Sequence, residues 1–535
     1  MRLNDKELTD RAQWEKAGVV LPKFDRGAMI AATGKAPRWV HFGAGNIFRA
    51  FPAALAQTML ERGLCDTGIV VAEGYDGEII DKCFAPLDNL TLLVTLKADG
   101  TTEKQVIASV ASSYRMDKDL QALRDVFAKP SLQMASFTIT EKGYSTRGAD
   151  GNFLPGISDD MRAGPEAPTS YLGRIAALCH ERYARGAQPL AMVSMDNCSH
   201  NGDILFAAVE AFALEWVRNG RAEAGFLDYV RDPRKMSFPW TMIDKITPRP
   251  DDGVRDMLAA AGLEEMQGIV TGKNTYAAPF VNAEETQYLV VEDIFPNGRP
   301  ALEKTGVLFT QRETVDKVER MKVCTCLNPL HTALAVFGCL LGYTRISEEM
   351  KNPDLVKLIE GIGYREGLPV VTDPGVISPR EFIDTVINVR LPNPFMPDAP
   401  QRIAMDTSQK VGIRFGGTIR AYRDDGNLSV ESLTLIPLVL AAWLRYLLGI
   451  DDDGKPFTVS PDPLYDSLAP HLSGIALGQK GPFHATLEPI LSDAKIFGLD
   501  LYEAGLGGRI ESYFEELLDG PGAVARTLRK YTEQS

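Results

Sequence analysis

Three side chains that can act together on a carbonyl or an alcohol lie in one short segment of the chain: Lys322, Asn328 and His331. A lysine amine can take up or deliver a proton, an asparagine amide can hold an oxygen, and an imidazole can hold a hydroxyl. Their combination in one segment indicates proton transfer at a carbon–oxygen group.

Each of the three residues also has a structural interpretation. Lys322 lies in a largely apolar run, where desolvation moves a lysine toward the neutral pKa that a general base needs, but a lysine that extends to solvent fits the same run. Asn328 precedes Pro329, so it is expected to be the N-cap of a helix that begins with that proline. His331 would then lie in the first helical turn, where the helix dipole lowers the pKa of an imidazole, although a packed histidine fits that position as well.

A zinc site is the alternative for this segment, because Cys324 and Cys326 precede His331. One residue between two cysteines is not the usual zinc spacing, and Pro329 with its helix disturbs the geometry. We therefore expect no metal ion, and the thiols are interpreted as small buried groups.

A glycine turn, Gly43-Ala-Gly45, follows residues 39–42, which are expected to form a strand, and precedes a helix that extends to about residue 61. Strand, glycine turn and helix start is the arrangement that presents backbone N–H groups to a dinucleotide pyrophosphate. Phe48 replaces the third glycine of the full fingerprint, so a purely structural turn stays as an alternative.

Glu73 stands at the carboxyl end of the next predicted strand, residues 68–72. An acidic side chain there can accept a hydrogen bond from the ribose 2′-hydroxyl of NAD and repels the 2′-phosphate of NADP. Together with the lysine segment, these features predict hydride transfer with NAD as the cofactor.

Another polar cluster follows the predicted strand at residues 190–194. Asn197 lies there, at the carboxyl edge where α/β sheets bind ligands. For its neighbours Asp196 and Asn201, capping of the following helix is the competing interpretation.

The chain is expected to have two domains. Strand-like runs with helical patterns between several of them predict an open, largely parallel α/β sheet in the first part, at residues 39–42, 68–72, 91–96, 106–110, 134–140 and 190–194. The stretch 91–110 leaves no room for a helix and is expected to be an antiparallel excursion. Apolar-periodic segments predict a mainly helical second part, at residues 330–343, 353–362, 379–389, 430–448 and 509–518. We therefore predict a dinucleotide-binding domain at 1–310, with an irregular leader at 1–35 that packs on later residues, and a helical substrate-binding domain at 311–535.

Composition and charge narrow the class of protein. The chain has 535 residues, of which 45% are hydrophobic and 24% charged, as in soluble globular proteins with more than one core. A net charge of −14 argues against a nucleic-acid or membrane-surface partner. The most hydrophobic stretch, residues 433–444, is shorter than the ~20 residues of a membrane span. Seven cysteines without a framework spacing, and no signal-peptide pattern at the start, indicate reduced thiols in a cytoplasmic protein.

The motifs occur in an order that resembles a known family. They are Gly43-Ala-Gly45-Asn46-Ile-Phe-Arg49, Thr138-Ile-Thr-Glu141-Lys-Gly143-Tyr144, Asp196-Asn197, Ile243-Asp244-Lys245-Ile, and Lys322 to His331. Over about residues 36–520 the chain resembles the long-chain mannitol dehydrogenase family, which includes mannitol 2-dehydrogenases, fructuronate reductases and tagaturonate reductases. The stretch Cys-Leu-Asn-Pro-Leu-His is most similar to that of bacterial D-mannonate oxidoreductases.

The resemblance implies a Rossmann-type N-terminal domain, a mainly α-helical C-terminal domain and a metal-free reaction with NAD(P). It implies that Lys322 is the general acid and base, and that Asn197 and Asn328 hold the reacting oxygen. His331 would position the substrate, and Glu319 matches a position proposed to pass protons toward solvent. The expected cofactor-binding residues are Gly43, Gly45, Asn46, Arg49, Glu73, Glu141 and Asp244.

Two features depart from the family pattern. The expected spacing is Lys-x4-Asn, whereas Lys322 and Asn328 are separated by five residues; unless a bulge or turn absorbs the extra residue, the lysine points the wrong way. Lys245 replaces an arginine of the family signature, and a lysine cannot form the two parallel hydrogen bonds of a guanidinium. On composition alone, an ordinary surface ion pair also explains Asp244-Lys245.

The expected activity is the interconversion of D-mannonate and D-fructuronate with NAD. A sugar acid requires a partner for its carboxylate, and Arg390 and Lys410 are the candidates, with rim salt bridges as their alternative role. A tagaturonate reductase or a mannitol 2-dehydrogenase is the alternative within the family, and a non-catalytic NAD-binding protein is the alternative outside catalysis. The oligomeric state is left open.

Overall fold

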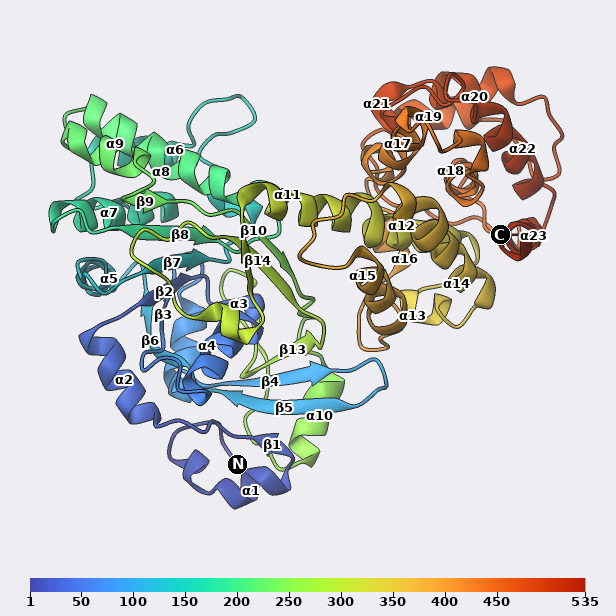
Figure 1. Ribbon diagram of the computed structural model, residues 1–535. Helices are drawn as coiled ribbons and strands as arrows, with labels where there is room; N and C mark the ends of the chain where they lie inside the picture. Colours follow the sequence, from blue (N-terminus) through green and yellow to red (C-terminus); the bar gives the residue numbers. More distant parts are fainter. Residues whose placement is uncertain (535) are drawn as a thin grey trace. The chain divides into compact units, whose positions relative to one another are not determined.

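The computed structural model describes residues 1–534, and the chain divides into two compact units (Figure 1). The first unit is Met1–Leu96 with Thr101–Asp316, and the second is Lys97–Gly100 with the chain from Lys317 onward. The division falls inside helix α11 (Arg312–Met321).

The first unit is built on a six-stranded parallel sheet in the order β6-β3-β2-β7-β8-β9. Its strands are β2 (Trp39–Phe42), β3 (Ile69–Glu73), β6 (Val110–Arg115), β7 (Met134–Phe137), β8 (Leu190–Ser194) and β9 (Met236–Ser237). The chain runs outward from β2 through β3 to β6, and then starts again on the other side of β2 with β7. This is the strand order of dinucleotide-binding folds, with its switch point between β2 and β7, and it confirms the predicted α/β Rossmann-type domain.

Alternate residues of the central strands enter different cores, as the period of two in a strand requires. Phe42 and Val70 pack with one group of helices: α5 (Leu120–Phe127), α6 (Pro155–Ala163), α7 (Tyr171–Ala184), α8 (Asn201–Arg218) and α9 (Ala224–Arg231). Trp39 and Val71 pack on the opposite face with α3 (Asn46–Ala50), α4 (Pro52–Glu61) and residues of the smaller sheets. Both faces of the parallel sheet are therefore covered, which explains its continuous apolar runs.

Three smaller sheets complete the first unit. The antiparallel pair β4 (Thr91–Leu96) and β5 (Thr102–Ile107) confirms the predicted antiparallel excursion. It joins β1 (Val19–Val20) and β13 (Phe280–Glu284) in one sheet. The other strands are β10 (Thr241–Asp244), β14 (Tyr288–Glu292) and β15 (Leu308–Thr310) in a three-stranded sheet, and the pair β11 (Ile269–Val270) and β12 (Tyr276–Ala277), with α10 (Asp252–Ala260) between β10 and β11.

Three local predictions for this unit were wrong. The leader is not irregular, because it contains α1 (Arg11–Lys16), β1 and α2 (Arg26–Lys35), and β1 pairs with β5. The predicted helix after the glycine turn breaks at Phe51, because Pro52 cannot supply the N–H that a continuous helix needs there. The predicted strand at 106–110 is two strands, β5 and β6, which are separated at residues 108–109.

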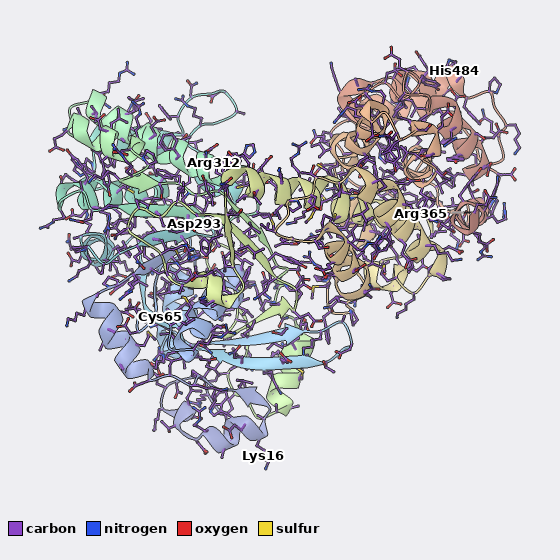
Figure 2. All side chains as sticks on the ribbon, viewed as in Figure 1. Lys16, Cys65, Asp293, Arg312, Arg365 and His484 are labelled. Carbon is purple, nitrogen blue, oxygen red and sulfur yellow. The ribbon has the colours of Figure 1, made fainter. Side chains whose placement is uncertain are left out.

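Helix α11 begins in the first unit, where Arg312, labelled in Figure 2, anchors its first turn. The guanidinium pairs with the carboxylate of Glu292 at 3.0 Å and lies 4.7 Å from the ring centroid of Trp240. The ion pair and the cation–π contact attach the first turn of α11 to this unit.

The second unit is helical, as predicted. Its helices are α12 (Asn328–Leu340), α13 (Ile346–Glu349), α14 (Pro353–Glu360), α15 (Pro379–Thr385), α16 (Pro400–Ile403), α17 (Gly417–Asp424), α18 (Leu435–Tyr446), α19 (Tyr465–Leu472), α20 (His484–Leu491), α21 (Ala494–Phe497), α22 (Gly507–Leu517) and α23 (Ala523–Gln534). All of α18 is buried, and it packs against α12 and α22. Glu366 accepts the N–H groups of Thr434, Leu435 and Ile436 at 2.7 Å, so a carboxylate satisfies the N-terminus of this central helix.

Several helices of the chain contain π-helical segments, in which one turn holds an extra residue. These segments are Ile80–Phe84, Lys322–Cys326, Gly361–Gly367, Val386–Arg390 and Gly412–Gly416. A π segment arises where one residue is inserted into an α-helix and is frequent at functional sites. Two of the predicted site residues, Lys322 and Arg390, lie in such segments.

One helical stretch, Arg312–Leu340, has the length and apolar composition that a membrane span requires. Most of its apolar window is buried inside the protein, as in core helices of soluble proteins. The buried residues include nearly all of α12, which packs against α16 and α18.

Candidate functional site

The glycine turn lies at the switch point of the parallel sheet. Gly43 has φ +106°, and a Cβ there would lie 2.2 Å from the carbonyl oxygen of Thr138, which follows β7. Only glycine therefore permits β2 and β7 to end this close together. A Cβ at Gly45 would meet no atom within 4 Å, so the protein leaves space beside the second glycine.

Glu73 holds this turn through its carboxylate. One oxygen accepts the N–H of Ala44 at 2.9 Å, and the other accepts the N–H groups of Tyr75 and Asp76 at 2.8 and 3.0 Å. The acid at the end of β3 thus connects the glycine turn to the turn after its own strand. This contact was not foreseen, since the sequence indicated only a ribose contact for Glu73.

The two polar residues after the glycine turn have different surroundings. Asn46, the first residue of α3, is partly exposed. The guanidinium of Arg49 is buried, donates to the hydroxyl of Thr91 at 3.0 Å and the carbonyl of Ala278 at 2.8 Å, and burial lowers its pKa to about 10. In this structure Arg49 binds α3 to the neighbouring sheet, and its predicted cofactor contact stays a prediction.

The loop after β7 is held by Asp196, which follows β8. Its carboxylate accepts the N–H groups of Ile139 and Thr140 at 2.9 and 2.8 Å and the hydroxyl of Tyr144 at 2.6 Å. Burial raises the pKa of Asp196, although these three hydrogen bonds lower it. The loop that carries exposed Glu141 and the chain at exposed Asn197 are therefore connected by one carboxylate.

The expectation that Asp196 or Asn201 caps α8 was wrong. The residue before α8 is His200, and no side chain caps the helix. Asn201 is buried and bonds instead to the backbone of Asp196 and to Thr241 of β10. The amide of Asn201 connects the end of β8 to the start of β10, because the buried backbone groups at both strand ends need hydrogen-bond partners.

Asp244 and Lys245 lie at the end of β10. Asp244 is buried, with 6% of its surface exposed. Lys245 donates to the carbonyl of Glu284 at 2.8 Å and to the side chain of Gln287 at 3.0 Å. The ammonium group of Lys245 thus donates separate hydrogen bonds to two neighbouring oxygens, whereas an arginine could bind one carboxylate with two parallel bonds.

In the second unit, Lys322 is buried, with 6% of its surface exposed, and opens the π segment Lys322–Cys326. Glu319 lies one turn earlier in α11 and is partly exposed. Asn328 is the first residue of α12 and makes no capping hydrogen bond, so the prediction that it is the N-cap was wrong by one residue. The π segment ends at Cys326 and Leu327 takes the cap position, because the extra residue of the π turn shifts the start of the next helix.

His331 lies in the first turn of α12, and its pKa is lowered to about 4. The expected direction is confirmed, but burial is the largest cause, and the charges of Arg414, Arg402 and Arg390 add to it. Asp398, which lies 3.7 Å from Nε2 of His331, opposes the shift. This buried Nε2 has no hydrogen-bond partner among residues 1–534, so a neutral imidazole is left ready to contact a ligand.

Arg414 is a member of this group that sequence reasoning missed. It lies in the π segment Gly412–Gly416 and donates a hydrogen bond to the hydroxyl of Thr332, the residue after His331. Arg390 is buried in another π segment, and Lys410 donates to the carbonyl of Met405. The second unit thus gathers cations near His331 in a protein of net charge −14.

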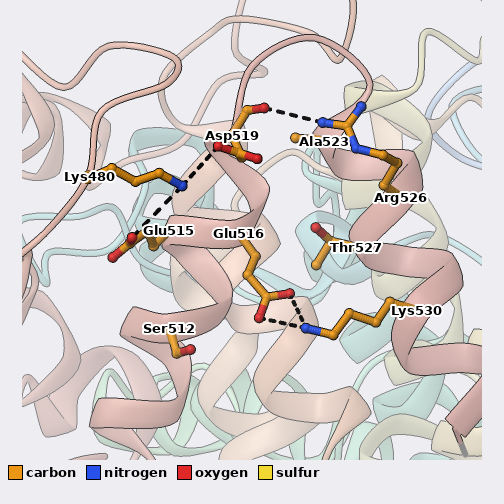
Figure 3. A pocket seen from close by; sticks show the side chains of 9 residues that line it. All are labelled: Lys480, Ser512, Glu515, Glu516, Asp519, Ala523, Arg526, Thr527 and Lys530. Carbon is orange, nitrogen blue, oxygen red and sulfur yellow. Dashed lines mark hydrogen bonds and ion pairs between the residues drawn. The ribbon is translucent and has the colours of Figure 1, made fainter.

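A surface pocket of about 520 Å³ between α22 and α23 does not share these properties (Figure 3). Its charges pair with one another: Lys480 with Asp519 and Lys530 with Glu516, both at 2.9 Å. Lys480 also lies 4.0 Å from Glu515, and Arg526 donates to the carbonyl of Asp519 at 3.2 Å. Because its charged groups are neutralised within the pocket, it is a weaker candidate than the His331 region.

Among residues 1–534, no group of three or more His, Cys, Asp or Glu side chains is placed to hold a metal ion. Burial raises the pKa of Cys326 to about 12, which keeps that thiol protonated. Cys324 and Cys326 are both free thiols.

Comparison with known proteins assigns both units. Residues 37–304 match the mannitol dehydrogenase Rossmann domain, and residues 314–518 match the mannitol dehydrogenase C-terminal domain. The chain belongs to the mannitol dehydrogenase family. The D-mannonate oxidoreductase of Thermotoga maritima is 51% identical over 99% of both chains.

More distant members of the mannitol dehydrogenase family extend this comparison. The D-mannonate oxidoreductase of Escherichia coli K12 is 30% identical over 80% of this chain and 83% of its own. The solved mannitol 2-dehydrogenase of Pseudomonas fluorescens, in a ternary complex with NAD and D-mannitol, is 28% identical and covers 100% of both chains with a TM-score of 0.69. The family and the two-domain type of fold inferred from the motifs are confirmed.

The spacing from Lys322 to Asn328 was the main departure from the pattern expected for a mannitol dehydrogenase family member, and the π segment Lys322–Cys326 lies within this interval. A π turn contains about one residue more than an α turn, so one added residue can be absorbed without rotating the helices on either side. The segment Lys322–Cys326 occupies the place in the sequence where the extra residue must be absorbed.

Proposed function

We propose that the protein is an NAD-dependent oxidoreductase that interconverts D-mannonate and D-fructuronate, with Lys322 as the general acid and base. The observation that supports this choice of substrate is the 51% identity to a D-mannonate oxidoreductase over 99% of both chains. The cations near His331 agree with it, because a sugar acid, unlike a polyol, brings a negative charge that they can attract.

The first unit fits a dinucleotide. Gly43 allows the close approach of β2 and β7, and the space beside Gly45 leaves room for a phosphate near backbone N–H groups. Glu73 fixes the turn and places a carboxylate at the end of β3, where it disfavours a 2′-phosphate. We propose NAD as the cofactor, with Asn46, Arg49, Glu141 and Asp244 as further contacts carried over from the family. The nicotinamide supplies or accepts the hydride.

The residues of the second unit would handle the proton and the oxygen. The amine of Lys322 delivers a proton to the carbonyl oxygen of the keto acid during reduction and takes it back during oxidation. Its burial keeps bulk water away from this proton. Glu319, one turn earlier and partly exposed, is proposed to pass the proton to solvent.

The amides are proposed to stabilise the reacting oxygen. Asn328 makes no capping bond, so its side chain is not committed to the start of α12, and Asn197 is proposed as the second amide by resemblance. Donors fixed in advance stabilise a developing oxyanion without reorganisation. His331, neutral because of its low pKa and unpaired at Nε2, holds a substrate hydroxyl.

The purified protein tests this function with NADH and three keto sugars in parallel: D-fructuronate, D-tagaturonate and D-fructose. We expect the highest kcat/KM with fructuronate, measured by the loss of NADH absorbance. A preference for tagaturonate assigns the epimeric reaction, and activity with fructose alone assigns a mannitol 2-dehydrogenase, the activity named for the relative from Pseudomonas fluorescens. Stoichiometric NADH binding without turnover on any of them contradicts the proposal.

A further inference from the structure

We propose that Arg414 binds the carboxylate of the sugar acid and so selects the substrate. This inference rests on the proposed function, because it names the group that recognises the acid at the same site. It also changes the expectation from the sequence, which gave this role to Arg390 and Lys410.

Arg414 is carried by a rigid support. A Cβ at Gly412 would lie 2.6 Å from the carbonyl oxygen of Ile496, and a Cβ at Gly416 would lie 1.8 Å from that of Phe497. The π segment Gly412–Gly416 is therefore pressed directly onto the backbone of α21, which only glycine permits. A cation on such a support keeps its place with little loss of entropy when an anion binds.

The same π segment packs against the two elements that carry the proposed proton chemistry. It contacts the π segment Lys322–Cys326 and helix α12. These contacts place the segment of Arg414 beside the helix that carries His331, and the charge of Arg414 helps to lower the pKa of His331. Its guanidinium is therefore in the right place to bind one end of a molecule whose hydroxyls contact His331.

Thr332 orients the guanidinium. Its hydroxyl accepts a hydrogen bond from Nη1 of Arg414 and donates one to the carbonyl oxygen of Asn328 at 2.8 Å. Thr332 is buried, with 1% of its surface exposed. A chain of hydrogen bonds thus connects Arg414 to the backbone of the proposed oxyanion-holding residue.

Arg414 lacks a carboxylate partner in the part of the chain that the structure describes. Asp398, the acid near His331, pairs with Arg402. Asp462 accepts hydrogen bonds from the N–H and the hydroxyl of Ser408. A guanidinium has five N–H donors, and Thr332 uses only Nη1, so the remaining donors can bind a carboxylate.

Lys410 is less suited to this role. Its amine donates to the carbonyl of Met405, five residues earlier, and so closes its own turn. Lysine is also a point charge, whereas arginine holds a carboxylate with two parallel bonds. Lys410 therefore contributes positive charge to the site, and Arg414 supplies the directed contact.

Arg414→Gln and Arg414→Lys test the inference, with Arg423→Gln as the control. Arg423 is an exposed arginine of α17 that pairs with Asp424, so its loss removes the same charge from the same region. We expect Arg414→Gln to lower kcat/KM for fructuronate by about 100-fold and to change kcat/KM for uncharged fructose less than about 3-fold. Arg414→Lys should recover part of the loss with fructuronate, and Arg423→Gln should behave as wild type.

A binding measurement separates this inference from the proposed function. Titration of D-mannonate into each protein by calorimetry, with D-mannitol as the uncharged comparison, requires no turnover. If the wild type fails to reduce fructuronate but binds mannonate, and Arg414→Gln loses that binding, the proposed function fails and the carboxylate site stands. If fructuronate is reduced and Arg414→Gln is unaffected, or fructose and fructuronate suffer equally, the assignment of Arg414 is wrong. If only Arg390→Gln loses mannonate binding and fructuronate reduction, the assignment of Arg414 is also wrong. It is wrong as well if the wild type does not bind mannonate.

Discussion

The carboxylate of Glu73 accepts the backbone N–H of Ala44 at 2.9 Å. The residue that we propose to distinguish NAD from NADP thus also fixes the glycine turn on which the pyrophosphate is proposed to lie. The other oxygen of Glu73 holds the turn at Tyr75 and Asp76, so the proposed cofactor selection and the shape of the proposed cofactor site depend on the same side chain.

Glu73→Gln should therefore weaken NADH binding. A glutamine has one acceptor oxygen, so it loses at least one of three hydrogen bonds to a charged acceptor, each worth about 1.5–3 kcal/mol. We expect the KM for NADH to rise about 10-fold and NADPH to gain relative to NADH, because the negative charge is gone. Steady-state kinetics with both cofactors measures this, with the exposed Asp66→Asn as the control. An unchanged KM for NADH contradicts the role of Glu73.

The π segment Lys322–Cys326 gives a prediction on chain length. Deletion of Cys324 converts the π turn to an α turn and restores the Lys-x4-Asn spacing of the family, so the helices on either side keep their orientation. We expect turnover within about 10-fold of wild type. Insertion of one alanine after Cys324 is the matched control and should abolish turnover, because a helix rotates by about 100° per residue. Equal tolerance of both changes rules out this account of the spacing.

The parts of the fold that the sequence predicted are those fixed by local patterns. The strand predicted at 39–42 forms there and the one predicted at 68–72 forms at 69–73, because both faces of each strand are buried, and Gly43 turns where only glycine fits. The break at Phe51 and the one-residue shift of Asn328 come from helix-terminal and π geometry, which apolar periodicity does not report.

The proposed role of Arg414 was not predictable for a different reason. Nothing in the sequence around it separates it from the other arginines of the helical unit. Its hydrogen bond to Thr332 spans 82 residues, and its place on α21 depends on Gly412 and Gly416. By contrast, Lys322 and His331 could be proposed from the sequence because they lie in one segment with Asn328.

Glu349 predicts how the stability of the helical unit depends on pH. Its side chain is fully buried, neither oxygen has a hydrogen-bond partner among the described residues, and burial raises its pKa from 4.5 to about 9. Between these values the folded protein keeps a proton that the unfolded chain has lost, so stability falls as the pH rises. The loss is about 1.4 kcal/mol per pH unit.

Urea unfolding of wild type and Glu349→Gln at pH 6 and pH 8 measures this effect. From pH 6 to pH 8, the free energy of unfolding of wild type should fall by about 3 kcal/mol relative to that of Glu349→Gln. Glu348→Gln, at an exposed neighbouring position that pairs with Lys351, should parallel wild type. If the stabilities of Glu349→Gln and wild type changed equally with pH, the carboxyl of Glu349 in the wild type would not titrate in this way.

The central claim is that Lys322 transfers the proton in a reaction whose hydride comes from NADH, and Lys322→Ala tests it most directly. General acid–base catalysis contributes about 10²–10⁴-fold, so we expect kcat for fructuronate reduction to fall by about 10³-fold. The dissociation constant of NADH should stay within about 3-fold of wild type, because the proposed cofactor contacts lie in the first unit. Turnover near that of the wild type, with NADH binding intact, would contradict the account.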